Sequence, residues 1–193
     1  MLLITLTAGV LAASPGAVPE LRSGDIVLQA NHSGMSDAIQ RATSSQYSHV
    51  GIVEVTPQGA FVIEAIDPVS RTPFDRWRAR GTGGHLTVMR PHVEETLISA
   101  TLAWARGELG KPYDTHYSWD DDNKVYCSEL VVKAFEHGAH IELGRRVRLD
   151  ALKLSQDERT LAALAGVPLS REVVPPGSLA SDPQLELVFT DMQ

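Results

Sequence analysis

The sequence of 193 residues contains a single cysteine, Cys127, which excludes an internal disulfide and a zinc site built from several cysteines. No cluster of basic residues is longer than the GRRVR segment at residues 144–148, and the formal net charge is −7. A nucleic-acid backbone is therefore not an expected partner. Hydrophobic residues make up 43% of the chain and charged residues 21%, which is typical of one globular domain that fills its own core.

The apolar run at residues 2–13 is too short to span a bilayer. It is typical of the apolar part of a secretory signal peptide, with Val10 and Ala12 as a small-residue cleavage pattern, although no Lys or Arg precedes it. We therefore expect residues 1–22 to be a leader and residues 23–193 to be the domain of a periplasmic or secreted protein. The alternative is that the run is a plain first strand, which would fit a cytoplasmic protein.

Residue patterns predict short strands and amphipathic helices that do not alternate as βαβ units, so the predicted class is α+β. A helix over 93–110 should bury Leu97, Ala100, Thr101, Trp104 and Leu109, and Gly110 should end it. A helix over 125–138 should end at Gly138, and Ser155 with Glu158 should form a capping box before a third helix. The remaining predicted elements are strands at 23–30, 48–55, 60–67 and 85–91, a helix at 34–45, and a strand near the C-terminus.

The segment TPQG at residues 56–59 predicts a tight turn that joins two strands. In such a hairpin the numbers of paired residues sum to about 115, so Gly51 would face Glu64. Because side chains alternate along a strand, His49 and Glu64 would share one face as diagonal neighbours within side-chain reach. Gly51 would leave an open space beside the carboxylate. A one-residue bulge would break this register.

Cys127 lies in or just before the first turn of the helix predicted at 125–138. It shares a helical stripe with Leu130, Val131 and Ala134, which directs the sulfur toward the core. Unpaired N–H groups and the positive end of the helix dipole favour a thiolate there. A thiolate, an imidazole to share its proton and a carboxylate to orient that imidazole would together form an activated nucleophile.

Each member of this set also has a simpler interpretation. A lone buried cysteine is usually a small hydrophobic residue, and a lone histidine on a strand is usually structural. Glu64 differs, because a carboxylate between apolar strand residues requires a partner. The residues alone leave the catalytic and structural interpretations open.

Several stretches resemble the YiiX/YaeF-like branch of the NlpC/P60 superfamily, which are bacterial permuted papain-like amidases. They are SGDIVLQ, YSHVGIVEV, VIEAI, ARGELGKPYDTHYSWDDDNKVYCSELVVKAF and VVPPGSLASDP, in family order. The resemblance implies a circularly permuted papain-like fold, with an antiparallel sheet or half-barrel packed against helices. It implies that Cys127 is the nucleophile, His49 the general base and Glu64 the residue that orients His49. The permutation would explain why His49 precedes Cys127.

The same resemblance implies cleavage of an amide, or an ester, through a thioester, with no cofactor and no metal. The expected partner is a small-molecule, peptide or lipid amide such as an acylated amino acid or a cell-wall peptide. The protein would then work near membrane lipid, and the oligomeric state stays open.

Further residues are weaker candidates for a role beside Cys127, His49 and Glu64. Tyr47 and Tyr126 flank His49 and Cys127, and either phenol could donate to an oxyanion, as could the backbone N–H of Cys127; the alternative is that both tyrosines are wall residues. Trp119 is a candidate for lining the substrate cleft. The acidic run at 120–122 is expected to be a solvated loop, because it lacks the ligand pattern of a calcium loop. Helix rise places His137 and His140 about 15 Å or more from Cys127.

Two rival functions fit the same residues. One is an acyltransferase of the lecithin:retinol acyltransferase type, whose cysteine lies in an Asn-Cys-Glu-His-Phe context from which YCSEL departs. The other is a lipid- or amino-acid-binding module that keeps the papain-like fold without turnover.

Overall fold

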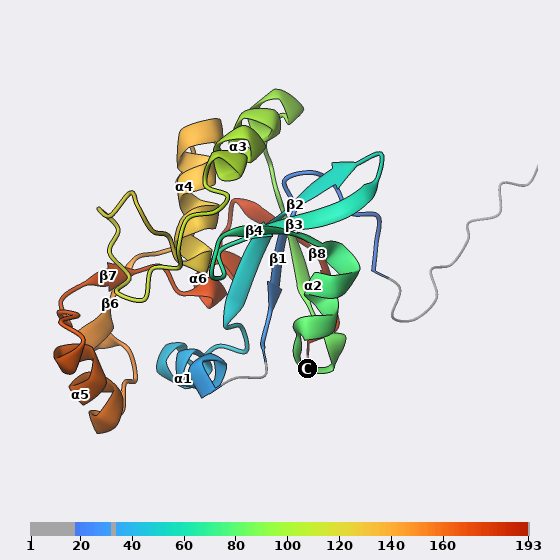
Figure 1. Ribbon diagram of the computed structural model, residues 1–193. Helices are drawn as coiled ribbons and strands as arrows, with labels where there is room; N and C mark the ends of the chain where they lie inside the picture. Colours follow the sequence, from blue (N-terminus) through green and yellow to red (C-terminus); the bar gives the residue numbers. More distant parts are fainter. Residues whose placement is uncertain (1–17, 32–33, 193) are drawn as a thin grey trace, which may run out of the picture.

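Six strands form one sheet, shown in the computed structural model of Figure 1, which describes residues 18–31 and 34–192. The strand order is β4-β3-β2-β1-β5-β8, and every neighbouring pair is antiparallel. This arrangement confirms the predicted α+β class. The strands are β1 (Ile26–Gln29), β2 (His49–Thr56), β3 (Gly59–Glu64), β4 (Ser70–Pro73), β5 (Thr87–Pro91) and β8 (Leu185–Thr190).

The β2–β3 hairpin has the register that the TPQG turn predicts. Thr56 pairs with Gly59 and Ile52 pairs with Ile63, so the residue numbers of each pair sum to 115. The pairing continues without a register shift between these two points. His49, at the start of β2, therefore lies on the same face of the sheet as Glu64, at the end of β3.

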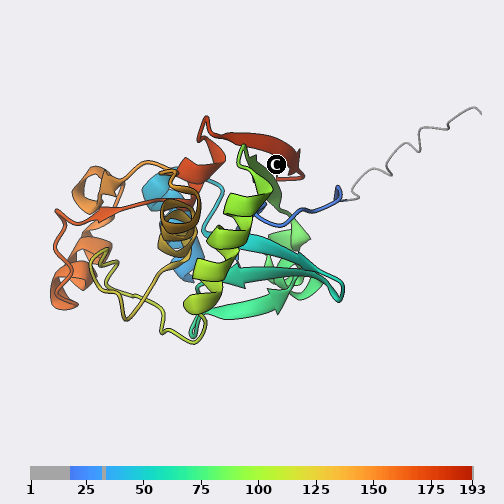
Figure 2. The same ribbon diagram turned by 90° about the horizontal axis from the view of Figure 1, so that it is seen from above.

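The sheet separates two apolar clusters. Ile26, Leu28, Val50 and Ile52 point to one face, where they join the cluster that includes α4 (Cys127–Ala139). On the other face, Val27, Val53 and Val62 pack against Phe74 and Trp77 of α2 (Phe74–Arg80). Figures 1 and 2 show α2 on one side of the sheet and the pair of α3 (Glu95–Gly107) and α4 on the other.

Gly138 does not end its helix as predicted. α4 continues to Ala139, and His140 provides the left-handed C-cap with a φ of 57°. Gly138 instead allows α3 to approach α4, because a Cβ atom at this position would lie 2.2 Å from the backbone nitrogen of Thr101. The glycine therefore serves a close helix–helix contact.

The predicted buried face of α3 is correct in part. The helix ends at Gly107, so Leu109 lies beyond it and is 39% exposed. Apolar residues occur on both sides of this helix, so the sequence alone does not fix which side faces the core. Thr101 belongs to the buried stripe of Ile98, Thr101, Leu102 and Ala105. Leu97 and Trp104 are half-buried and pack against the same core cluster, whereas Ala100 is exposed.

The C-terminal part of the chain adds a small layer beside the start of α4. The capping box of α5 (Gln156–Leu164) is confirmed, since Glu158 N donates to Ser155 Oγ at 3.2 Å and Ser155 N donates to Glu158 Oε2 at 2.7 Å. α1 confirms the helix predicted at 34–45, whereas α2, β4, β6, β7 and α6 were not predicted. The remaining bounds are α1 (Gly34–Thr43), β6 (Val147–Arg148), β7 (Glu172–Val173), α6 (Pro176–Ala180) and 3₁₀ turns at Thr82–Gly84 and Leu149–Ala151.

The predicted leader lies mostly outside the described residues, which begin at Val18. Val18 and Leu21 pack against the apolar cluster under α2, and the carbonyl oxygen of Glu20 accepts a hydrogen bond from Arg90 Nη2 at 3.3 Å. Residues 18–22 are thus part of the packed domain. Within the described part of the chain, every helix is too short or too polar to cross a bilayer.

Candidate active site

His49 and Glu64 meet on the α2 face of the sheet. His49 Nε2 lies 2.6 Å from Glu64 Oε2, and the two residues are 6% and 0% exposed. The hairpin positions both groups, because it fixes them as diagonal neighbours on adjacent strands. The predicted contact between the imidazole and the carboxylate is therefore present.

Glu64 keeps its negative charge although it is fully buried. Burial raises the pKa of this carboxyl, but the hydrogen bond and the charge of His49, with hydrogen bonds from Thr72 and Arg80, outweigh burial and lower it. Thr72 Oγ1 donates to Glu64 Oε1 at 2.6 Å, and Arg80 Nη2 donates to the same oxygen. No sequence pattern indicates Thr72 and Arg80, which belong to β4 and α2, the two unpredicted elements beside β3.

Cys127 is the first residue of α4, and its side chain forms a hydrogen bond with His49. Since Nε2 of the imidazole is bound to Glu64, Nδ1 is the nitrogen left for the sulfur. The order Cys127–His49–Glu64 is thus a continuous chain of hydrogen-bonded groups. The thiol is only 4% exposed.

The proton between Cys127 and His49 belongs on the imidazole. Burial opposes the charged form of both groups, but their mutual hydrogen bond and charges outweigh it. The pKa of Cys127 is lowered, helped by hydrogen bonds from the Tyr113 side chain and the backbone of Ser128. The pKa of His49 is raised to about 9 by Cys127 and Glu64 together. The lowered pKa of the thiol and the raised pKa of the imidazole together favour a thiolate and an imidazolium.

Two tyrosines of the loop between α3 and α4 are influenced by Cys127, and one of them, Tyr113, contacts the thiol. Tyr113 forms a hydrogen bond with Cys127, and burial with the nearby thiolate raises the pKa of Tyr113 well above its usual value. The same two causes raise the pKa of Tyr117 to about 12. Tyr113 is therefore protonated and donates to the sulfur. No sequence pattern indicates this contact of Tyr113, because an irregular loop has no periodicity from which to place a side chain.

The structure does not bring the hydroxyls of Tyr47 and Tyr126 to the sulfur. The Tyr47 hydroxyl lies 2.8 Å from Thr87 Oγ1 on β5. The Tyr126 hydroxyl accepts from the backbone nitrogen of Val174 at 3.2 Å. Both tyrosines are almost fully buried, which fits the alternative that they are wall residues.

Trp119 lies beside the middle of α4. Its carbonyl oxygen accepts from Lys133 Nζ at 2.7 Å, and the guanidinium of Arg146 lies 3.8 Å from the centre of its ring. Lys133 Nζ also lies 5.4 Å from the centre of the ring, so the indole faces two cations, and none of its described interactions is with Cys127.

The open space predicted at Gly51 does not exist. A Cβ atom there would lie 2.4 Å from Val62 Cγ1 and 2.9 Å from the carbonyl oxygen of Ile63. Val62 fills the position, because the neighbouring strand packs directly on the glycine. Gly51 therefore permits close packing of the hairpin and opens no cleft beside the carboxylate.

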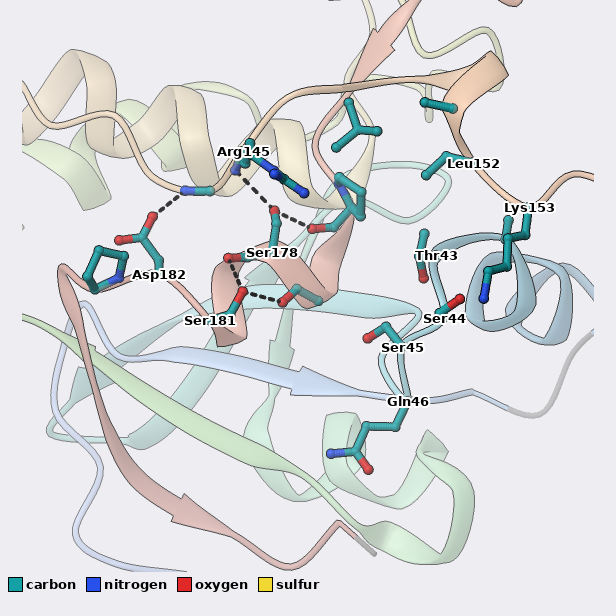
Figure 3. A pocket seen from close by; sticks show the side chains of 17 residues that line it. Thr43, Ser44, Ser45, Gln46, Arg145, Leu152, Lys153, Ser178, Ser181 and Asp182 are labelled. Atoms are coloured by element: carbon teal, nitrogen blue, oxygen red, sulfur yellow. Dashed lines mark hydrogen bonds between the residues drawn. The ribbon is translucent and has the colours of Figure 1, made fainter.

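A cavity of about 950 Å³ lies apart from these residues (Figure 3). The end of α1, the 144–153 segment and α6 form its walls, and Arg145, Lys153 and Ser178 are among its lining side chains. It contains neither Cys127 nor His49, so its size does not make it the site of the chemistry.

A cysteine that begins a helix, beside a sheet histidine whose other nitrogen meets a carboxylate, is the arrangement of papain-like folds. Residues 20–189 match the family described as permuted papain-like amidase enzyme, YaeF/YiiX, C92 family. The chain belongs to this family, and the predicted circularly permuted papain-like fold is confirmed.

Two relatives show the extent of the similarity. The uncharacterized protein YiiX of Escherichia coli strain K12 is 35% identical over 191 residues, which cover 95% of this chain and 93% of YiiX. A crystal structure of YiiX from Escherichia coli O157:H7 is 34% identical, with a TM-score of 0.82 over 89% of this chain and 98% of that one. The similarity thus extends over nearly the whole domain.

The crystallised YiiX is described as a metalloprotein. In the described part of this chain, no group of three or more His, Cys, Asp or Glu side chains is placed to hold a metal ion. In the acidic run, Asp122 is 94% exposed at its side chain and lies 3.7 Å from Lys133 Nζ. The described residues therefore do not fit a metal centre built on three such ligands.

Proposed function

We propose that this protein is a cysteine hydrolase that cleaves an amide bond through Cys127, His49 and Glu64. The observation that carries the proposal is the buried, continuous chain of hydrogen bonds from the thiol through the imidazole to the carboxylate. Membership of the amidase family supports amide chemistry.

In the acylation step, the Cys127 thiolate attacks the carbonyl carbon of the substrate and forms a C–S bond. The carbonyl oxygen becomes an oxyanion in the tetrahedral intermediate. His49, which already carries the proton, transfers it to the leaving nitrogen as the C–N bond breaks. The products are a free amine and a thioester on Cys127.

In the deacylation step, His49 takes a proton from a water molecule whose oxygen attacks the thioester carbon. The C–S bond breaks, the acid leaves, and the thiolate and imidazolium return. Glu64 stays ionised throughout because Thr72 and Arg80 also donate to it. Its role is to hold the imidazole with Nε2 toward the carboxylate and to stabilise the imidazolium.

The groups nearest the sulfur are suited to stabilise the oxyanion. The backbone N–H of Cys127 belongs to the first turn of α4, where N–H groups have no partner within the helix. The Tyr113 hydroxyl already contacts the sulfur and stays protonated. Two such donors, fixed before the reaction, are the usual elements of an oxyanion hole.

The substrate class follows from the access to the thiol. With Cys127 4% exposed and in contact with Tyr113, the group that reaches the sulfur must be slender. An acyl chain or an extended peptide end meets this condition. We therefore favour acylated amino acids, lipid amides or cell-wall peptides, with esters of the same acids as further substrates.

Alkylation by iodoacetamide, read by intact mass, tests this proposal against a non-catalytic binding module. The wild type should alkylate rapidly near neutral pH, and His49→Ala should slow the reaction by about tenfold or more because the thiolate loses its partner. His137→Ala is a matched control, since His137 stacks on Trp104 with ring centres 5.0 Å apart and lies on the same helix as Cys127.

Equal rates for the wild type and His49→Ala would contradict the catalytic assignment. An acyltransferase is distinguished by product analysis with an acylated lysine and a second amine. Release of the free acid supports the hydrolase, and transfer of the acyl group to the amine supports the rival.

A further inference from the structure

Gln29 is buried directly beside the proposed catalytic histidine. It ends β1, is 0% exposed, and pairs across the strands with His49. Side chains of paired residues in an antiparallel sheet project from the same face, so the carboxamide and the imidazole are neighbours. Within the described residues, neither Oε1 nor Nε2 of Gln29 has a hydrogen-bond partner.

The fold makes room for this carboxamide at Gly81. A Cβ atom on Gly81 would lie 2.4 Å from Gln29 Oε1. The backbone of Gly81 has a φ of −69°, which any residue can adopt, so the glycine is not required by its conformation. The absence of a side chain there therefore serves the placement of Gln29.

In the described part of the chain, two more polar atoms on the α2 face of the sheet lack a hydrogen-bond partner. Trp77 Nε1 and Arg80 Nε are also buried without a partner among the described residues. The Trp77 ring lies 6.4 Å from the ring of His49, and Arg80 binds Glu64 through another nitrogen. Unpartnered polar atoms thus gather around the His49–Glu64 pair on the α2 face.

Buried polar atoms without partners destabilise a fold, and native structures contain few of them. An apolar side chain at position 29 would remove this cost, as Val27 does on the same face of β1. A group that lowers stability and lies beside reacting residues is a candidate for a functional role.

We propose that Gln29 is a positioning residue that acts through His49, an inference that rests on the proposed hydrolase function. In an apolar environment the imidazolium–thiolate pair would revert to a neutral imidazole and thiol. The fixed dipole of the carboxamide gives the imidazole a polar neighbour and so favours the charged pair. Gln29 is fully buried, so it does not touch the substrate.

The titratable and charged groups around this pair come from several elements. They include Tyr117 and Tyr126, whose pKa values are raised by burial and by the charge of the Cys127 thiolate. Cys127 on α4 and Glu64 on β3 contact His49 directly. Tyr113 faces the sulfur from the loop before α4, and Arg80 of α2 reaches Glu64. Because Gln29 has no titration of its own, a shift in a pH profile after its replacement reports on the pair.

The test is Gln29→Met, which keeps the length of the side chain and removes its dipole. We expect the midpoint of the pH profile of Cys127 alkylation to rise by about one unit, so that alkylation below the midpoint slows about tenfold. The melting temperature should stay the same or rise, because two unpartnered polar atoms leave the core.

Thr101→Val is the matched control. Thr101 is 0% exposed on α3, and its hydroxyl donates to the carbonyl oxygen of Leu97 at 2.9 Å. Loss of this satisfied hydrogen bond should lower the melting temperature and leave the alkylation profile unchanged.

Gly81→Ala is a second route to the same perturbation, because its methyl group must displace the carboxamide of Gln29. It should shift the profile in the same direction, and the double variant should shift it by less than the sum of the two. An unchanged midpoint in both single variants, with a depressed wild-type midpoint, would overturn this inference alone. A wild-type midpoint near that of a free thiol, about 8.5, would overturn the proposed function and this inference with it.

Discussion

At the scale of single residues, the charge of Glu64 decides the state of the thiol. A carboxylate without partners would be neutral in such a buried place. Here three donors converge on it, and its charge in turn holds a proton on His49. The imidazolium then lowers the pKa of Cys127. Three pKa values are thus set by one arrangement of hydrogen bonds.

This arrangement predicts a bell-shaped dependence of kcat/KM on pH. On the acid side activity rises as the thiolate forms, at a pH below the usual thiol value because the pKa of Cys127 is lowered. On the alkaline side activity falls near pH 9, where His49 loses the proton that the leaving amine needs. The profile should be measured with a substrate first identified by testing the purified protein on acylated amino acids, cell-wall peptides and lipid amides.

Glu64→Gln checks the cause of the alkaline limb. The carboxylate raises the pKa of His49, so its replacement by a neutral amide should move the alkaline limb to lower pH by about one unit. The thermal unfolding midpoint shows whether the fold is retained. An alkaline limb that stays in place in a folded variant would assign it to a group other than His49.

At the scale of elements, the contact between α3 and α4 holds the cysteine helix in position. We expect Gly138→Ala to reduce the free energy of unfolding by about 1–3 kcal/mol, because the new methyl group would overlap the backbone of Thr101. This loss exceeds the gain of up to about 1 kcal/mol from the higher helix propensity of alanine. Urea denaturation monitored by circular dichroism measures the difference.

Gly107→Ala provides the control for that measurement. Gly107 is the last residue of α3, and a Cβ atom there would have no atom within 4 Å. The substitution should leave stability unchanged or raise it slightly. Equal effects of the two alanines would mean that the helices can separate without cost at Gly138.

Elements with a local signal could be predicted from the sequence, and elements fixed by distant contacts could not. The turn at Pro57 and the capping box at Ser155 depend only on neighbouring residues, and both are present. The choice of which face of α3 is buried, and the role of Gly138 in α4, depend on the contact between these two helices and not on neighbouring residues in the sequence. The same reason explains Tyr113, whose position depends on how its loop packs against the start of α4.

At the scale of the whole molecule, some contacts of the site follow from a local signal and others depend on segments that are distant in the sequence. His49 and Glu64 belong to one hairpin, so the register alone brings them together. Cys127 is distant in the sequence, so its place at the start of a helix made it a candidate partner of the pair, and the family resemblance favoured that assignment over a structural one. Arg80 reaches Glu64 from an element that the sequence did not predict, so no pattern indicated its contact.

The extent of the packed domain also bears on the predicted leader. Val18 and Leu21 lie in the apolar cluster under α2, so a cut that removed them would expose that cluster. Cleavage after Ala12, which the small residues Val10 and Ala12 favour, would leave both in place. We therefore expect the chain expressed in a bacterium to lose residues 1–12 and to appear in the periplasmic fraction or the medium.

Intact mass and N-terminal sequencing of each cell fraction measure this outcome. Ala12→Gln is a suitable control, because a larger side chain at the cleavage position should leave the full-length chain in the membrane or cytoplasmic fraction. A wild-type protein that keeps Met1–Ala12 in the cytoplasm would contradict export. Cleavage beyond Leu21 with an unchanged melting temperature would contradict the packing argument, because the removed side chains would then contribute nothing to the core.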